Sequence, residues 1–284
     1  MNSPAARTTL ARRGSLLTKE MQIKLKISNF KEIDIEAVNQ ILNLSEKTKG
    51  LLSAIKTYSY NIFAVKEATN DNELVTTVSY ILAHENIFDT LPIINEKFLS
   101  FIRKVQSSYK SITYHNKTHA ADLAQNFYYF IENGGLREKC DLDNWDICSY
   151  ILAASCHDLG HPGFANPYLI EKGDLIAIRY NDMSVLENYH IAMTFEILSK
   201  SDYNIFADLE KSDYKRVRKT MIGAVLATDM SMHFNKIGIL KGKLSASELD
   251  ATQEAEKKFI CEQIFHLCDI ANSTKDFSLC EKWT

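Results

Sequence analysis

The chain has 284 residues, of which 45% are hydrophobic and 24% charged, and its formal net charge is −3 at pH 7. This balance is typical of a folded globular protein, and the slightly acidic charge excludes a general attraction to nucleic acid. No apolar run is long enough for a transmembrane helix, and the six cysteines contain no CxxC pair, which argues against a disulfide framework. We expect a cytoplasmic protein, with recruitment to a membrane left open.

The first 30 residues are polar and basic, so we predict a disordered basic tail over 1–30 and one helical domain over 31–284. Within the tail, Ser15 follows Arg12-Arg13-Gly14. This pattern resembles the sites used by basic-directed kinases such as the cAMP-dependent kinase, and phosphate there would add roughly −1.5 to −2 charges. The alternative is a chance match in a solvated tail.

The segment before residue 110 has the pattern of scaffold helices. Apolar residues recur at helical spacing from about 34 to 58. Asn70-x-x-Glu73 matches a capping box and predicts a helix through Leu82. A turn over 89–92 precedes a further helix with apolar residues from Phe98 to Val105 on its inner face. No residue in this part suggests chemistry.

The rest of the chain also predicts helices. We expect one over 115–131, and the Asp143-x-x-Asp146 pattern caps another that ends near His157. Ser184-x-x-Glu187 is again a capping box, opening a helix to about residue 200. Further helices are expected over about 213–226 and about 247–270, and no segment alternates as a strand does. The sequence therefore predicts an all-α fold.

Four of the eight histidines fall into two pairs, His115 with His119 and His157 with His161. Members of each pair are four residues apart, a spacing that places two side chains on one face of a helix. A lone histidine is more often structural, but two pairs with Asp158 beside one of them indicate a metal site.

Two carboxylates complete the predicted ligand set. Asp269 follows an apolar run and should be buried, where a carboxylate needs a partner. We predict His119, His157, Asp158 and Asp269 as direct ligands, because imidazole and carboxylate suit zinc and similar ions. Asp158 could bridge two ions that share a hydroxide, and the natural target of such a pair is a phosphoester.

From about residue 55 onward, the chain resembles a known family, the catalytic domain of the class I 3′,5′-cyclic-nucleotide phosphodiesterases. The matching motifs stand in the order Tyr114-His115-Asn116-x-x-His119-Ala120-x-Asp122, His157-Asp158-x-x-His161-Pro162-Gly163-x-x-Asn166, Tyr180-Asn181-Asp182-x-Ser184-Val185-Leu186-Glu187-Asn188, Leu226-Ala227-Thr228-Asp229-Met230-Ser231-x-His233 and His266-x-x-Asp269-Ile270-x-Asn272.

The resemblance implies a compact multi-helix domain with a binuclear site of the histidine-aspartate phosphohydrolase type, holding zinc plus magnesium or manganese. The four predicted ligands match those of the tighter ion, and Asp158 matches the bridge to the second. His161, Glu187 and Thr228 match groups that hold the second ion's waters. Glu187 and Thr228 have plainer alternatives, in a capping box and at a helix end.

The resemblance also implies the reaction. His115 matches the general acid that protonates the leaving 3′ oxygen, and Glu187 counts among the catalytic residues. Tyr114 and Asn272 match residues of the nucleotide pocket. We therefore expect a metal-dependent hydrolase of cyclic-nucleotide signalling that converts a cyclic nucleotide to its 5′-monophosphate. Asn272 and the kinase-like site at Ser15 favour cAMP, and a homodimer is a further expectation.

The chain departs from the family pattern in two places. The family usually has two histidines after Leu-Glu-Asn, whereas this chain has Tyr189-His190, and we expect a small effect. The family's domain continues past the region of Trp283, with the glutamine and the aromatic residue that hold the purine. We therefore expect a domain lacking its C-terminal part. The alternative function is a truncated, non-catalytic metal-binding form that regulates or dimerises.

Overall fold

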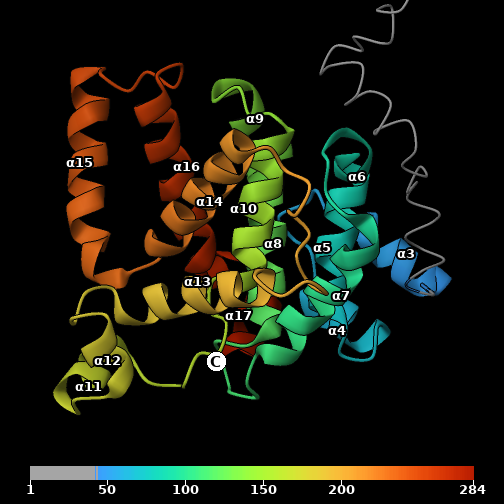
Figure 1. Cartoon of the computed structure of the whole chain (residues 1–284). Coiled ribbons are helices and arrows are strands. Elements are labelled where there is room, and N and C mark those ends of the chain that lie inside the picture. The colour runs from blue at the N-terminus through green and yellow to red at the C-terminus, as the bar shows by residue number, and fades with distance from the viewer. Residues whose placement is uncertain (1–41, 43) are drawn as a thin grey trace, which may run out of the picture. The chain divides into compact units, whose positions relative to one another are not determined.

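The computed structural model describes residue 42 and residues 44–284, which form helices joined by turns and loops (Figure 1). The described residues contain no β-strand, which agrees with the predicted all-helical class. The tail predicted over 1–30, with Ser15, lies outside the described residues. So does the first part of the helix predicted from about residue 34, of which the structure describes α3 (Glu46–Leu52).

The centre of the fold is a pair of helices, α8 (Lys117–Glu132) and α10 (Asn144–Cys156), which pack against each other. Every residue of α10 from Asp146 to Cys156 is buried. A helix that is apolar all round must be covered on every side, and the run Ile147–Cys156 contains no charged residue. The pair therefore forms a rigid support for side chains at its ends.

Other helices cover the central pair on two sides (Figure 1). On one side lies α5, which contacts both α8 and α10, and on the other lie α14 and α16. The bounds of this surrounding set are α4 (Ile62–Ala68), α5 (Glu73–His84), α7 (Asn95–Ser108), α13 (Val185–Leu198), α14 (Lys211–Leu226) and α16 (Glu254–Asp269).

The remaining elements are mostly short. They are α6 (Ile87–Thr90), α9 (Leu136–Lys139), α11 (Asn166–Glu171), α12 (Leu175–Arg179), α15 (His233–Ala246) and α17 (Phe277–Cys280), with 3₁₀ turns η1 (Met230–Met232), η2 (Ala271–Thr274) and η3 (Glu281–Trp283). The helix predicted over 247–270 is shorter than expected, because it begins at Glu254. A separate helix, α15, precedes it and was not predicted.

Helix α10 begins with the predicted capping box. The Asp143 carboxylate accepts the Asp146 N–H at 3.0 Å, and the Asp146 carboxylate accepts the Asp143 N–H at 3.4 Å. Arg216 of α14 donates to both Asp143 oxygens at 2.7 Å. These bonds fix the start of the helix that ends at His157.

We expect Asp143→Ala to lower the free energy of unfolding by about 1 kcal/mol, because the α10 N-cap is lost. Urea denaturation followed by circular dichroism measures this change. Asp143→Ser is the matched control, since serine keeps an oxygen for the cap but gives up the Arg216 ion pair. Equal loss of stability in both variants would contradict a capping role.

The capping box predicted at Asn70 and Glu73 is wrong, although a helix does start at Glu73. Asn70 lies in the left-handed region at φ 50°, and Asn72 stands at the N-cap without a side-chain bond. Glu73 is fully buried and accepts the Thr118 hydroxyl at 2.6 Å. Its carboxylate therefore holds α5 to α8 and does not cap its own helix.

Candidate metal centre

Two histidines lie where the ends of α8 and α10 meet. Asn116 caps α8 by accepting the N–H groups of Thr118 at 2.9 Å and His119 at 3.3 Å, which places His119 in the first turn. His157 follows the last residue of α10, and its Nδ1 lies 2.9 Å from the Ala154 carbonyl. The two imidazole centroids are 5.0 Å apart.

Asp269, at the end of α16, completes a first cluster with these histidines. Its Oδ1 lies 2.8 Å from Nε2 of His119 and 3.3 Å from Nε2 of His157. Both histidines are about 1% exposed. Nitrogen and carboxylate oxygen atoms converging this closely can act as ligands of one metal ion.

The hydrogen bonding of His157 supports a cation at this point. Its Nδ1 donates to a carbonyl, so its Nε2 is the nitrogen that faces Asp158 and Asp269. Burial alone would lower the pKa of His157, but these two carboxylates outweigh it and raise that pKa well above its ordinary value. Nε2 of His157 and Oδ2 of Asp158 have no hydrogen-bond partner. A buried imidazole nitrogen facing two carboxylates favours a positive charge, which a proton or a divalent ion can supply.

A second cluster consists of Asp158, His161 and His190. Asp158 belongs to both clusters, because its Oδ2 lies 3.1 Å from Nε2 of His157 and its Oδ1 lies 3.8 Å from Nε2 of His190. Nδ1 of His190 lies 2.7 Å from the Leu159 carbonyl, which leaves Nε2 free to face Asp158. Burial lowers the pKa of His161 to about 3 and that of His190 to about 4, so both are neutral at pH 7.

The prediction that each histidine pair shares a helix face is wrong. His115 lies before α8 begins, and His161 lies in the loop after α10. The two are instead stacked on each other, with ring centroids 4.1 Å apart and planes at 15°. The loop depends on Gly160, whose φ is 75° and where a Cβ would come within 2.5 Å of the Met193 sulfur.

A cavity of about 590 Å³ opens beside the two clusters. Its polar wall includes the predicted residues His115, Asp158, His161, Glu187, Thr228 and Asp269. The exposed side chains of Phe164, Ile170 and Met230 form part of an apolar wall. The volume suits a small organic ligand.

Glu187 is not the capping residue that its position suggests. Ser184 adopts the left-handed conformation at φ 42°, makes no cap bond, and donates its hydroxyl to Asp229 at 2.7 Å. The Glu187 carboxylate instead lines the cavity and accepts the Asn166 amide at 2.9 Å. Burial, helped by Asp229 and Asp158, raises the pKa of Glu187 to about 7.

The remaining predicted residues lie nearby. Thr228 lines the cavity while its hydroxyl donates to the Val225 carbonyl at 2.8 Å. Asn272 donates to the Tyr114 hydroxyl. The Tyr114 ring lies 4.7 Å from that of His119, and neither Tyr114 nor Asn272 is among the residues lining the cavity.

Sequence reasoning gave no role to His190 or Asn166. His190 is 1% exposed and belongs to the second cluster, and Asn166 holds Glu187. The signal for His190 was its position three residues after Glu187 in a predicted helix, a spacing that places both on one face.

Comparison with known proteins gives a family-model match and several similar chains. The model of the 3′5′-cyclic nucleotide phosphodiesterases matches residues 114–284. "Probable 3′,5′-cyclic-AMP phosphodiesterase pde-4" of Caenorhabditis elegans is 31% identical over 229 residues, covering 78% of this chain and 34% of that protein.

Two further similar proteins cover almost the same region. "Dual specificity calcium/calmodulin-dependent 3′,5′-cyclic nucleotide phosphodiesterase 1B" of Mus musculus is 31% identical over 235 residues, which is 82% of this chain and 43% of that protein. "High affinity cAMP-specific and IBMX-insensitive 3′,5′-cyclic phosphodiesterase 8" of Drosophila melanogaster is 30% identical, covering 82% and 26% respectively. The chain thus spans less than half the length of each of these proteins.

Proposed function

Because the chain belongs to the 3′,5′-cyclic nucleotide phosphodiesterase family, we propose that it hydrolyses a 3′,5′-cyclic nucleotide to the nucleoside 5′-monophosphate. The observation that carries this proposal is Asp158, whose two oxygens face the first and the second cluster beside a cavity of about 590 Å³. Cyclic AMP is proposed as the preferred substrate, since two of the similar proteins are named for cyclic AMP.

The proposed cofactors are two divalent ions. His119, His157, Asp158 and Asp269 would hold zinc, and Asp158 would also contact magnesium or manganese beside His161 and His190. Bound ions of this kind neutralise phosphoryl charge and lower the pKa of a water molecule. The mixed nitrogen and oxygen set of the first cluster suits zinc, whereas magnesium keeps several waters.

The proposed roles of the other residues follow from their places around the cavity. Glu187, His161 and Thr228 would hold waters beside Asp158. His115 would give a proton to the leaving 3′ oxygen. Burial lowers the pKa of His115 and the Asp158 carboxylate opposes this effect. A bound phosphodiester would add a further negative charge and favour the protonated imidazole.

The Tyr114–Asn272 pair would contact the nucleotide, and residues 31–284 would form the catalytic domain. The described residues include no helix both long and apolar enough to cross a membrane. A cytoplasmic location, a homodimer and phosphorylation of Ser15 by a cAMP-dependent kinase stay predictions, and the last is supported by Arg12-Arg13 alone.

A direct assay tests the proposed function. We expect the full-length chain, supplied with Zn²⁺ and Mg²⁺, to convert cAMP to AMP faster than it converts cGMP to GMP. The His157→Ala variant loses a central ligand and should be inactive. Turnover of neither nucleotide, with wild type and variant alike, would overturn the proposal. Faster turnover of cGMP would overturn only the preference.

A further inference from the structure

The proposed proton donor, His115, lies on a non-helical segment between α7 and α8, residues 109–116. This segment, here called the His115 segment, begins at Tyr109, directly after α7, and ends at Asn116, the N-cap of α8. A functional side chain on a connecting segment keeps one position only when neighbouring groups hold that segment in place. The geometry of His115 therefore depends on what anchors residues 109–116.

Tyr109 joins the start of this segment to the end of α10. Its hydroxyl donates to the Ser155 carbonyl at 3.0 Å, across 46 residues of chain. Ser155 lies in the last turn of α10, where backbone carbonyls have no partner within the helix. The neighbouring Ala154 carbonyl lies 2.9 Å from Nδ1 of His157. Two side chains therefore satisfy the end of α10, one from a predicted metal ligand and one from the His115 segment.

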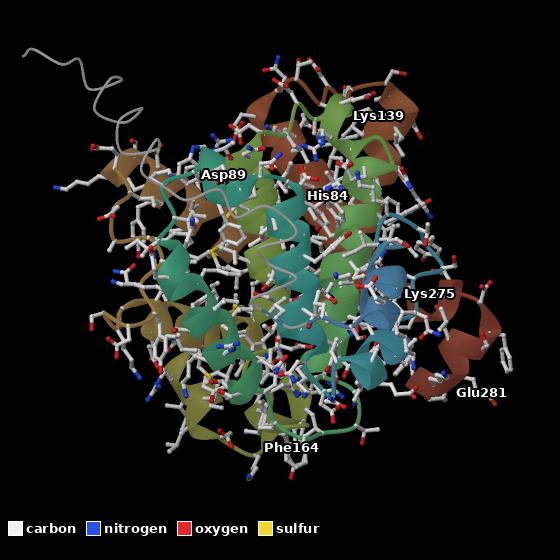
Figure 2. All side chains as sticks on the ribbon, turned by 90° about the vertical axis from the view of Figure 1, so that its right-hand side faces the viewer. His84, Asp89, Lys139, Phe164, Lys275 and Glu281 are labelled. Atoms are coloured by element: carbon white, nitrogen blue, oxygen red, sulfur yellow. The ribbon has the colours of Figure 1, made fainter. Side chains whose placement is uncertain are left out.

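The surroundings of Tyr109 suit a lasting hydrogen bond. Its partly buried ring packs against the main hydrophobic core. Burial raises the pKa of the Tyr109 hydroxyl well above its ordinary value, and the nearby Asp158 carboxylate adds to this effect. The hydroxyl therefore keeps its proton and can donate. Figure 2 labels Phe164, a few residues after Asp158, near the bottom of the view and Lys139, just before α10, near the top.

The rest of the His115 segment lies along the loop that follows α10. A Cβ at Gly163, whose φ is 88°, would lie 3.8 Å from Cγ2 of Ile112. His115 stacks on His161, with ring centroids 4.1 Å apart. Within the segment, the Asn116 amide donates to the Ile112 carbonyl at 2.9 Å. Of the contacts from this segment to α10 and its loop, the Tyr109 bond is the directional one, because the other two are packing contacts.

We propose that Tyr109 is a positioning residue, whose hydrogen bond to the Ser155 carbonyl holds His115 where it can pass a proton to the leaving 3′ oxygen. The inference rests on the proposed function, in which His115 is the proton donor. Tyr109 is not among the residues that line the cavity, so it acts through His115. A proton donor has to lie within hydrogen-bond reach of its acceptor, and displacement of His115 slows the transfer without weakening the binding of the nucleotide.

Steady-state kinetics of Tyr109→Phe test the proposal on the full-length chain loaded with Zn²⁺ and Mg²⁺. Phenylalanine keeps the ring and removes only the hydroxyl. We expect kcat to fall about tenfold or more while KM stays within about twofold and the metal content stays that of the wild type. Tyr60→Phe is the matched control, because it also removes a buried hydroxyl, 3.5 Å from that of Thr77, and should keep the wild-type kcat.

A double-mutant cycle separates the positioning of His115 from a general loss of structure. In a His115→Ala background, Tyr109→Phe should lower kcat by less than about twofold, because the group that it positions is gone. Equal falls in both backgrounds would overturn the proposal. So would a wild-type kcat in Tyr109→Phe, or a loss of bound metal from that variant.

Hydrogen exchange followed by mass spectrometry detects the anchor without any turnover. The amides of residues 110–116 should exchange faster in Tyr109→Phe than in the wild type and in Tyr60→Phe, because the segment has lost its bond to α10. Unchanged exchange would overturn the proposal. If the wild type hydrolysed neither nucleotide, the proposed function would fail, whereas faster exchange in Tyr109→Phe would still support the anchor.

Discussion

Replacing Asp158 with asparagine is expected to lower kcat for the proposed cyclic-nucleotide hydrolysis about a thousandfold or more, equivalent to about 4 kcal/mol of barrier. One oxygen of Asp158 faces His119 and His157, and the other faces His190. Asparagine offers a single carbonyl oxygen and no charge. One of the two clusters therefore loses the oxygen that Asp158 supplies to it. The substitution hardly changes side-chain volume, which keeps the packing around α10.

Metal content and a control variant test the role of Asp158 separately from turnover. Elemental analysis should show fewer divalent ions per chain for Asp158→Asn than for the wild type, independently of turnover. Asp174→Asn is the matched control, because Asp174 caps α12 through the Ile176 N–H and does not line the cavity. If Asp158→Asn kept full metal content and near wild-type kcat, Asp158 would not join two ions.

The sequence predicts the parts of this fold that depend on local pattern. Apolar spacing indicated α8 and α10, and the Asp143 capping box marked the start of α10 correctly. These features are local because each involves residues within one or two turns. The same pattern failed at Asn70 and Ser184, because both residues have a left-handed backbone and the Ser184 hydroxyl bonds to Asp229.

Long-range contacts explain what the sequence could not predict. Asp269 reaches His119 across 150 residues of chain, and Lys275 reaches the buried Asp122 at 2.6 Å across 153. The family motifs named Asp269, but only the folded chain shows that the Lys275–Asp122 ion pair ties the end of η2 to α8. Pairing His115 with His161 likewise depends on a loop conformation that no helical periodicity describes.

Glu187→Gln is expected to lower kcat about tenfold to a hundredfold and to change the pH profile. The pKa of Glu187 is raised to about 7, chiefly by burial. The carboxylate form, which accepts hydrogen bonds from water, is therefore lost in the wild type as pH falls below about 7. Wild-type activity should fall on that acidic side, whereas glutamine does not titrate, so this part of the fall should be absent from the variant.

The raised pKa of Glu187 also affects the free energy of unfolding, which should fall as pH rises while the activity rises. Because the folded-state pKa of Glu187 exceeds the ordinary value of 4.5, the folded chain binds its proton more tightly than the unfolded chain does. Its contribution to stability is present below pH 4.5 and is lost as pH rises to about 7. Urea denaturation between these pH values should therefore show wild-type stability falling relative to Glu187→Gln. A parallel pH dependence in both proteins would mean that Glu187 keeps an ordinary pKa, and the acidic fall in activity would then belong to another residue.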